Sequence, residues 1–158
     1  MLDAPTIVKT NAQHIAAIRL RVAWNEMQAV MGPGVAEVTA AVAAQGVAAT
    51  GPWFNHHFRA PTDTFDFEIC VPVATPVKPA GRVRPGELAA ATVARAIYHG
   101  DYRGLGAAWG EFRDWIAANG HEASAEFWEV YVAGPESSVN PADWRTELNW
   151  PLIAGKDG

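Results

Sequence analysis

A carboxylate set among apolar and aromatic residues is the first feature of chemical interest in this sequence. Residues 127–152 contain two predicted strands, FWEVYV and DWRTELNWPL, joined by a loop rich in Pro, Gly and Ser. Alternation predicts that Glu129 and Tyr131 share one face of the first strand, and that Glu147 and Asn149 share one face of the second. A buried carboxylate costs free energy unless a positive or donating group meets it. We therefore expect Tyr131 and Glu147 to face one cavity, whose aromatic wall and negative charge suit a lipophilic cation.

The strand that carries Glu147 has a counterpart earlier in the chain. FEICVPV aligns with TELNWPL at an offset of 79 residues, which places Glu68 on Glu147. Each half then reads as strand, helix, strand, strand. We predict a single α+β domain, residues 1–158, of two modules related by a pseudo-twofold, about 1–78 and 79–158. An antiparallel sheet would carry both helices on one face and a ligand cleft, with Glu68 and Glu147, on the other.

The elements that position these residues follow from hydrophobic periodicity. Two helices are expected, Trp24–Gln45 and Gly104–Asn119, ending at Gly46 and Gly120. Within the first, Gly32-Pro33-Gly34 predicts a turn, with the main helix beginning just after it. The remaining strands are predicted at residues 14–22, 51–58, 65–73 and 87–98, with a connector at 74–86.

The seven tryptophans supply further candidates for a pocket wall. Trp24, Trp53 and Trp144 lack a clear core phase and are expected to line the pocket, whereas Trp109 could serve either the core or the cleft. Trp115, Trp128 and Trp150 are predicted to belong to the helix-packed core. The ligand-binding candidates are, in all, Glu147, Tyr131, Glu129, Asn149, Trp53, Asn55, His57, Glu68, Trp109, Trp24 and Trp144.

Other chemistries find less support in the sequence. His56 and His57 are consecutive in a predicted strand, so their imidazoles point to opposite faces and no metal site is expected. Cys70 is interpreted as a small core residue, and no Gly-rich phosphate loop implies a cofactor. For Glu147 the alternative is an ordinary ion pair with Arg145 or Arg95 on a solvated edge.

Composition excludes several classes of partner. The chain has 158 residues, 49% of them hydrophobic, and a formal net charge of −5. Without a basic stripe, direct nucleic-acid binding is not expected, and no apolar run is long enough to span a membrane. A single cysteine excludes an internal disulfide and is typical of a reducing cytoplasm, where we expect this protein.

Four motifs in order carry a resemblance to a known family. YHGDY, GLGAAWGEFRDWIAANG, WEVYVAGP and TELNWPL resemble the GyrI-like small-molecule-binding domains, and the likeness extends over nearly the whole chain. Such domains also form the effector-binding part of bacterial multidrug-responsive transcription regulators. The resemblance implies two strand-helix-strand-strand modules and a cleft for lipophilic, often cationic, aromatic compounds. It places the family's central acidic residue on Glu147 and an aromatic residue on Tyr131, while His57 stands where a tyrosine is common.

Two function classes follow from this resemblance. The first is a stand-alone effector domain that captures a lipophilic or cationic molecule, either to sequester it or to inform a partner. The partner would be a separate DNA-binding regulator or gyrase, and the protein would be a monomer or a homodimer. The alternative is a hydrolase of cyclopropane-bearing DNA-alkylating natural products, with Glu147 as the general base and Tyr131 as the orienting group. We favour the binding protein, because no second polar group is certain to hold a nucleophilic water.

Overall fold

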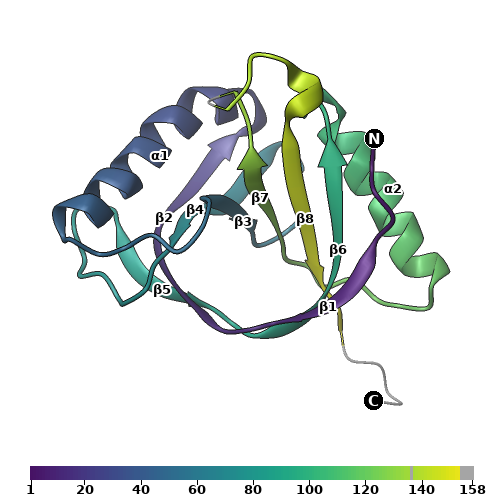
Figure 1. Ribbon diagram of the computed structural model, residues 1–158, viewed down its shortest axis with the longest axis horizontal. Helices are drawn as coiled ribbons and strands as arrows, with labels where there is room; N and C mark the ends of the chain where they lie inside the picture. The colour runs from purple at the N-terminus through teal and green to yellow at the C-terminus, as the bar shows by residue number, and fades with distance from the viewer. Residues whose placement is uncertain (136, 154–158) are drawn as a thin grey trace. The chain divides into compact units, whose positions relative to one another are not determined.

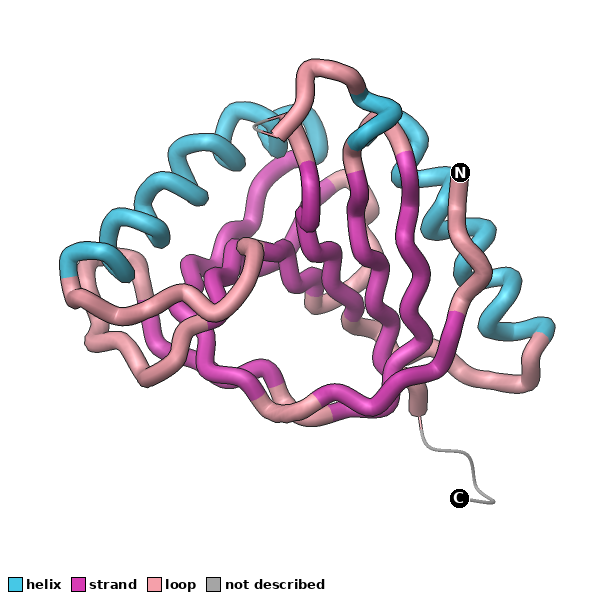
Figure 2. The backbone as a smooth tube through the Cα atoms, viewed as in Figure 1, coloured by secondary structure: helices cyan, strands magenta, loops and turns pink. Residues whose placement is uncertain are grey.

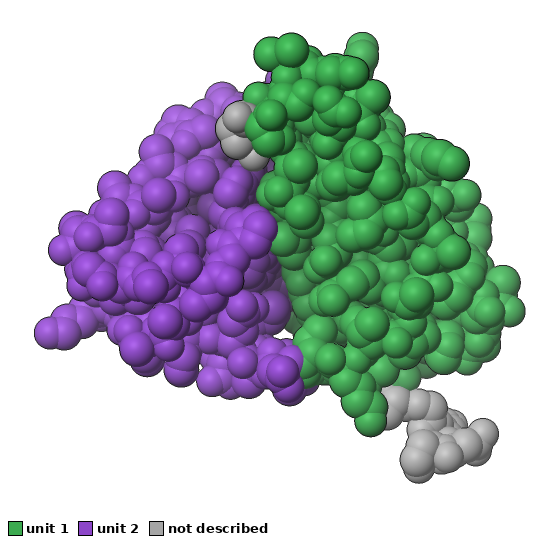
Figure 3. Space-filling model, in the orientation of Figure 1, with its two compact units in different colours: residues 1–10, 91–158 green, residues 11–90 purple. Residues whose placement is uncertain are grey.

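The computed structural model describes residues 1–135 and 137–153 (Figures 1 and 2). The chain divides into two compact units (Figure 3). Unit 2 is residues 11–90, and unit 1 combines residues 1–10 with 91–158. This division differs from the expected repeat boundary near residue 78. The N-terminal strand belongs with the second half of the chain, and residues 79–90 belong with the first.

Unit 2 contains four antiparallel strands in the order β3-β4-β2-β5 and one long helix. A short 3₁₀ turn, Trp24–Glu26, leads from β2 into the helix. The elements are β2 (Gln13–Ala23), α1 (Met27–Ala44), β3 (Phe54–His57), β4 (Thr64–Pro72) and β5 (Arg84–Leu88).

Unit 1 repeats this plan with the strand order β1-β6-β8-β7, again antiparallel throughout. Its elements are β1 (Thr6–Thr10), β6 (Ala91–His99), α2 (Leu105–Ala118), β7 (Phe127–Ala133) and β8 (Arg145–Pro151). 3₁₀ turns at Tyr102–Gly104 and Pro141–Asp143 precede α2 and β8. Each unit therefore has the order strand, helix, strand, strand plus one edge strand, and the expected α+β class with antiparallel strands is confirmed.

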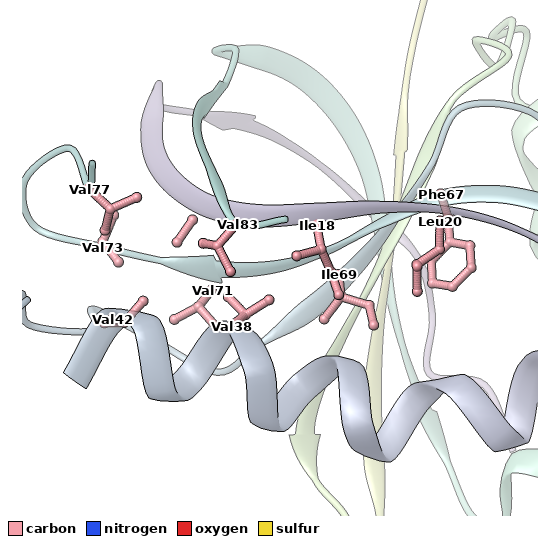
Figure 4. Close-up of a cluster of buried hydrophobic side chains, with 11 residues drawn as sticks. Ile18, Leu20, Val38, Val42, Phe67, Ile69, Val71, Val73, Val77 and Val83 are labelled. Carbon is pink, nitrogen blue, oxygen red and sulfur yellow. The ribbon is translucent and has the colours of Figure 1, made fainter. Parts of the chain in front are cut away.

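Each helix packs on one face of its own unit's strands. In unit 2, Val38 and Val42 of α1 point toward Ile69 and Val71 of β4 (Figure 4). The residues of β4 that alternate with these, Asp66, Glu68 and Cys70, lie on the face without a helix, as predicted. In unit 1 the buried helix residues are Ala108, Phe112 and Ile116, which pack with Ala94, Ala96, Tyr98 and Leu148.

The expected turn at Gly32-Pro33-Gly34 is wrong, because α1 runs without interruption from Met27 to Ala44. Pro33 lacks an N–H and so removes one hydrogen bond within the helix. Gly34 has a packing role: a Cβ built on it would lie 2.5 Å from Cδ1 of Ile69. The glycine lets the helix approach β4 closely. Its neighbour Gly32 is exposed and has no atom within 4 Å of a built Cβ.

The predicted helix ends are confirmed at both glycines. Gly46 and Gly120 adopt φ values of 66° and 77°, the left-handed conformation that glycine accepts without steric cost. Among the described residues, no helix combines the length and apolar character needed to cross a membrane.

Candidate functional site

The register of β7 and β8 changes the predicted site. Tyr131 lies opposite Thr146, and Glu147 lies opposite Val130. Directly opposed residues share a face. Tyr131 therefore lies on the face that α2 covers, and Glu147 lies on the other face of the same two strands. The expectation that both side chains face one cavity is therefore wrong.

Glu129 is the carboxylate that shares a face with Tyr131. The Tyr131 hydroxyl donates a hydrogen bond to Oε2 of Glu129 at 2.5 Å, and Nε1 of Trp109 donates to Oε1 at 2.6 Å. Strand β7 supplies the carboxylate and the tyrosine, and α2 supplies the indole. Each carboxylate oxygen thus has one neutral donor, which fixes the orientation of the group. Among the described residues, Glu129 has no cationic partner.

Aromatic rings surround this carboxylate on two sides. The Trp109 ring lies 4.6 Å from that of Phe127 and 5.3 Å from that of Trp150, measured between centroids. On the other side, the ring of Tyr102 meets Tyr131 edge-on at 5.9 Å and lies 5.1 Å from Trp144. Tyr102 is 36% exposed, and Glu129 itself is half-buried. We call Glu129, Trp109, Tyr131, Tyr102 and Trp144 the Glu129 site.

The electrostatics of the site follow from burial. Desolvation raises the pKa of the Glu129 carboxyl above its usual value, and the hydrogen bonds from Tyr131 and Trp109 act in the opposite direction. The negative charge is therefore destabilised in the free protein, since no positive group among the described residues compensates it. Opposite Tyr131, the hydroxyl of Thr146 is fully buried and has no hydrogen-bond partner among the described residues.

Glu147 has a different environment. Its Oε1 accepts a hydrogen bond from Nδ2 of Asn149 at 3.0 Å and lies 3.3 Å from Nε of Arg95. The ion pair considered as the alternative for Glu147 is therefore present, with Arg95 as the partner. It does not lie on an edge, because β8 runs between β6 and β7.

The profile of the GyrI-like small molecule binding domain matches residues 3–153 of the chain. The chain belongs to this family. Among curated proteins, no sequence matches it.

Solved structures with the same fold include EcmrR, as a separate C-terminal domain and in a DNA complex, and SAV2435 with a bound ligand. The C-terminal domain of EcmrR is 19% identical with a TM-score of 0.85, over 96% of this chain and 98% of that one. EcmrR in its complex with DNA is 20% identical with a TM-score of 0.84, over 96% of this chain and 58% of that one. SAV2435 bound to tetraphenylphosphonium is 10% identical with a TM-score of 0.69, over 96% and 95%. At these identities the likeness shows the fold, and this chain corresponds to little more than half of EcmrR.

In this GyrI-like domain, unit 2 carries neutral residues at the positions that match Glu129 and Tyr131. The offset of 79 aligns Ile69 with Leu148, and these two residues lie opposite Asn55 and Glu129, respectively. Asn55 and His57 are buried on the α1 face, where Asn55 Nδ2 donates to the Met31 sulfur at 3.6 Å. Burial, and secondarily the charge of His56, lowers the pKa of His57 to about 4, so the imidazole is neutral at pH 7.

Glu68 lies on the helix-free face of unit 2, opposite both His56 and Arg19. Burial raises the pKa of the Glu68 carboxyl, while the charges of His56 and Arg19 oppose that shift. Its neighbour Asp66 accepts two hydrogen bonds from Arg19, at 3.1 and 3.0 Å, and one from Arg21. This face therefore differs in charge and hydrogen bonding from the Glu129 site.

The other predicted residues are dispersed. Trp24 is 65% exposed, and Trp53 packs against the core of unit 2. Trp128 is buried, but it lies opposite Asn149 on the helix-free face and not in the helix-packed core as predicted. The described residues contain no group of three metal-ligating side chains. Sequence reasoning missed the role of Tyr102, although it lies within the YHGDY motif that carried the family resemblance.

Proposed function

We propose that this GyrI-like domain binds lipophilic monocations, with Glu129 as the counter-charge. The observation that carries the proposal is a desolvated carboxylate fixed by two neutral donors among aromatic rings, with no cationic partner among the described residues. Glu147, the carboxylate favoured from the sequence, already has Arg95 beside it. A monocation would have to compete with that guanidinium at Glu147, but not at Glu129.

The energetics favour a cation that is also apolar. A unit charge about 5 Å from the carboxylate gains roughly 3 kcal/mol at an effective dielectric constant of about 20. Contact with the faces of Trp144, Tyr102 or Trp109 adds about 0.5–2 kcal/mol per ring. Each 100 Å² of apolar surface removed from water adds about 2.5 kcal/mol. A small hydrated cation gains little of the last term, so the site selects bulky aromatic cations. SAV2435, which shares the fold, was solved with such a cation bound.

We infer that the binding serves capture or sensing in the cytoplasm. The domain would sequester a range of such compounds, or report their presence to a DNA-binding regulator or to gyrase, as a monomer or a homodimer. Two observations support this reading. The fold matches the C-terminal domain of EcmrR, which has also been solved in a complex with DNA. The sequence has a single cysteine, Cys70, which is free, as is typical of proteins from a reducing compartment such as the cytoplasm.

The test is a calorimetric titration of the protein with tetraphenylphosphonium. Glu129→Gln preserves both hydrogen bonds, because Gln can accept from Trp109 and donate to the Tyr131 oxygen. It removes only the charge. We expect affinity to fall by about 1–3 kcal/mol, roughly 5- to 150-fold. Glu147→Gln is the matched control and should leave the affinity unchanged. If Glu147→Gln weakened binding and Glu129→Gln did not, the site would be the one predicted from the sequence.

The same preparation tests the hydrolase alternative. A cyclopropane-bearing alkylator is incubated with the wild type and with Glu129→Gln, and the ring-opened product is quantified by mass spectrometry. The binding proposal expects no conversion above the uncatalysed rate. General base catalysis contributes about 10²–10⁴-fold to a rate. Conversion by the wild type that is lost in Glu129→Gln would therefore show that the protein is an enzyme.

A further inference from the structure

A second polar group lies in unit 1 on the face opposite the Glu129 site. Arg95 of β6 donates from Nε to Oδ1 of Asn149 at 2.7 Å, and the same Nε lies 3.3 Å from Oε1 of Glu147. Asn149 is fully buried and donates in turn to Oε1 of Glu147. The three side chains form a closed triangle. Its buried corner, Asn149, holds the guanidinium and the carboxylate in one arrangement.

This triangle leaves specific atoms available. All contacts of Arg95 within the described part of the chain involve Nε, so both Nη groups remain as donors. All contacts of Glu147 involve Oε1, so Oε2 remains as an acceptor. The Arg95 and Glu147 side chains are 32% and 22% exposed, which leaves them accessible to a small molecule. With Nε held, the planar guanidinium presents its two Nη groups as a fork that fits a carboxylate.

The charges decide which ligand fits. One positive and one negative group in contact sum to zero, so a monocation attracted by Glu147 is repelled by Arg95 at nearly the same distance, and a monoanion meets the reverse. A ligand that carries both charges close together gains from both groups. The adjacent strands contribute Ile97 and Val130 directly opposite Glu147, both half-buried, so apolar surface flanks the two charges.

We propose that Arg95 and Glu147 form a site for a small zwitterion of the amino-acid type with an apolar side chain. The ligand carboxylate accepts from the Nη groups of Arg95, and its ammonium donates to Oε2 of Glu147. In an α-amino acid the two charged groups are separated by one carbon, which matches an arginine and a glutamate in direct contact. This site is independent of the proposed cation site, because Glu129 and Glu147 lie on opposite faces of β7 and β8.

The first experiment compares three probes by NMR-detected titration. L-Phenylalanine carries both charges, 2-phenylethylamine only the ammonium, and 3-phenylpropionate only the carboxylate. We expect L-phenylalanine to bind with a dissociation constant of about 1 mM or tighter, and each single-charge probe at least about tenfold more weakly. No saturable shift with L-phenylalanine up to about 10 mM, or equal affinity for a single-charge probe, would overturn the proposal.

The second experiment locates the site. The double variant Arg95→Gln with Glu147→Gln removes both charges together and leaves no unpaired ion, and circular dichroism checks that it folds. It should lose L-phenylalanine binding and keep that of tetraphenylphosphonium. Glu129→Gln should show the opposite pattern. L-Phenylalanine binding that survives in the double variant would overturn the assignment, whatever happens to the cation. If neither variant lost affinity for tetraphenylphosphonium, only the cation site would be refuted.

Discussion

Gly34→Ala adds a single methyl group at the contact between α1 and β4, and its effect can be worked out from the structure. The added Cβ would lie 2.5 Å from Cδ1 of Ile69 and 3.3 Å from Cδ1 of Ile18. Real Cβ contacts are not found that close, so a side chain or the helix must move. Both isoleucines are fully buried, so a rotated Cδ1 would meet other packed atoms.

Two effects of opposite sign determine the size of the change. Overpacking of a filled core costs about 1–3 kcal/mol, and replacing glycine by alanine within a helix gains about 0.5–1 kcal/mol. We expect a net loss of about 1–2 kcal/mol in the free energy of unfolding, which lowers Tm by about 2–8 °C for a domain of this size. Gly110→Ala, within α2, is the matched control. No atom lies within 4 Å of its Cβ and no proline follows it, so only the gain remains and Tm should rise.

Urea unfolding followed by circular dichroism measures these differences. A double-mutant cycle with Ile69→Val removes the methyl group that the new Cβ would strike. Alone, Ile69→Val should cost about 0.5–1.5 kcal/mol. The double variant should be about 1–2 kcal/mol more stable than the sum of the two single-variant losses would give. If Gly34→Ala were as stabilising as Gly110→Ala, or if the cycle showed no coupling, the close approach at Gly34 would not be the reason for the glycine.

The remaining predictions concern the Glu129 site. Burial raises the pKa of Glu129 in the free protein, and a bound cation would lower it again. Cation binding therefore releases a proton. Affinity for tetraphenylphosphonium should therefore rise with pH, by up to about tenfold per unit, until the pH exceeds the pKa of the free protein. Constant affinity from pH 4 to 8 would contradict this linkage. Thr146→Val puts a methyl group in place of a buried hydroxyl that lacks a hydrogen-bond partner in the described part of the chain, and should raise the free energy of unfolding by about 1 kcal/mol. Thr146→Ser keeps the hydroxyl and should give no such gain in thermal melts.

Periodicity was sufficient for most of the fold. Apolar residues alternate around Ile69 in β4 and recur at helical spacing around Phe112 in α2. The pattern is clear because the apolar residues of each element lie on the face that packs in its unit's core. The strand predicted at residues 87–98 contains most of β6, since Thr92, Val93 and Ile97 favour extended structure. Its first two residues belong to β5, which begins within the predicted connector. The failure at Pro33 has the converse cause. Local propensity marks the Gly-Pro-Gly segment as a breaker, whereas the close contact at Gly34 depends on β4, more than 30 residues away in the chain.

The site was harder to predict because β7 and β8 are buried on both faces. Trp128 and Asn149 are buried on the helix-free face, and Leu148 is buried under α2. When apolar residues occupy both faces, alternation gives the period of a strand but not which face the helix covers. Only the pairing of Glu129 with Leu148 decides that question. The ion pair of Glu147 likewise depends on Arg95, 52 residues earlier. From the sequence, Arg95 and Arg145 were equally possible partners.

The division of the chain into units has a consequence for synthesis on the ribosome. Unit 2 is one continuous segment, so all of its strands and its helix are available once residue 90 has emerged. Unit 1 is discontinuous. Thr10, at the end of β1, hydrogen-bonds to Ala91, 81 residues later in the chain. β1 is therefore made before the whole of unit 2 but can pair only after β6 has emerged, so unit 2 can complete its core while β1 still awaits β6.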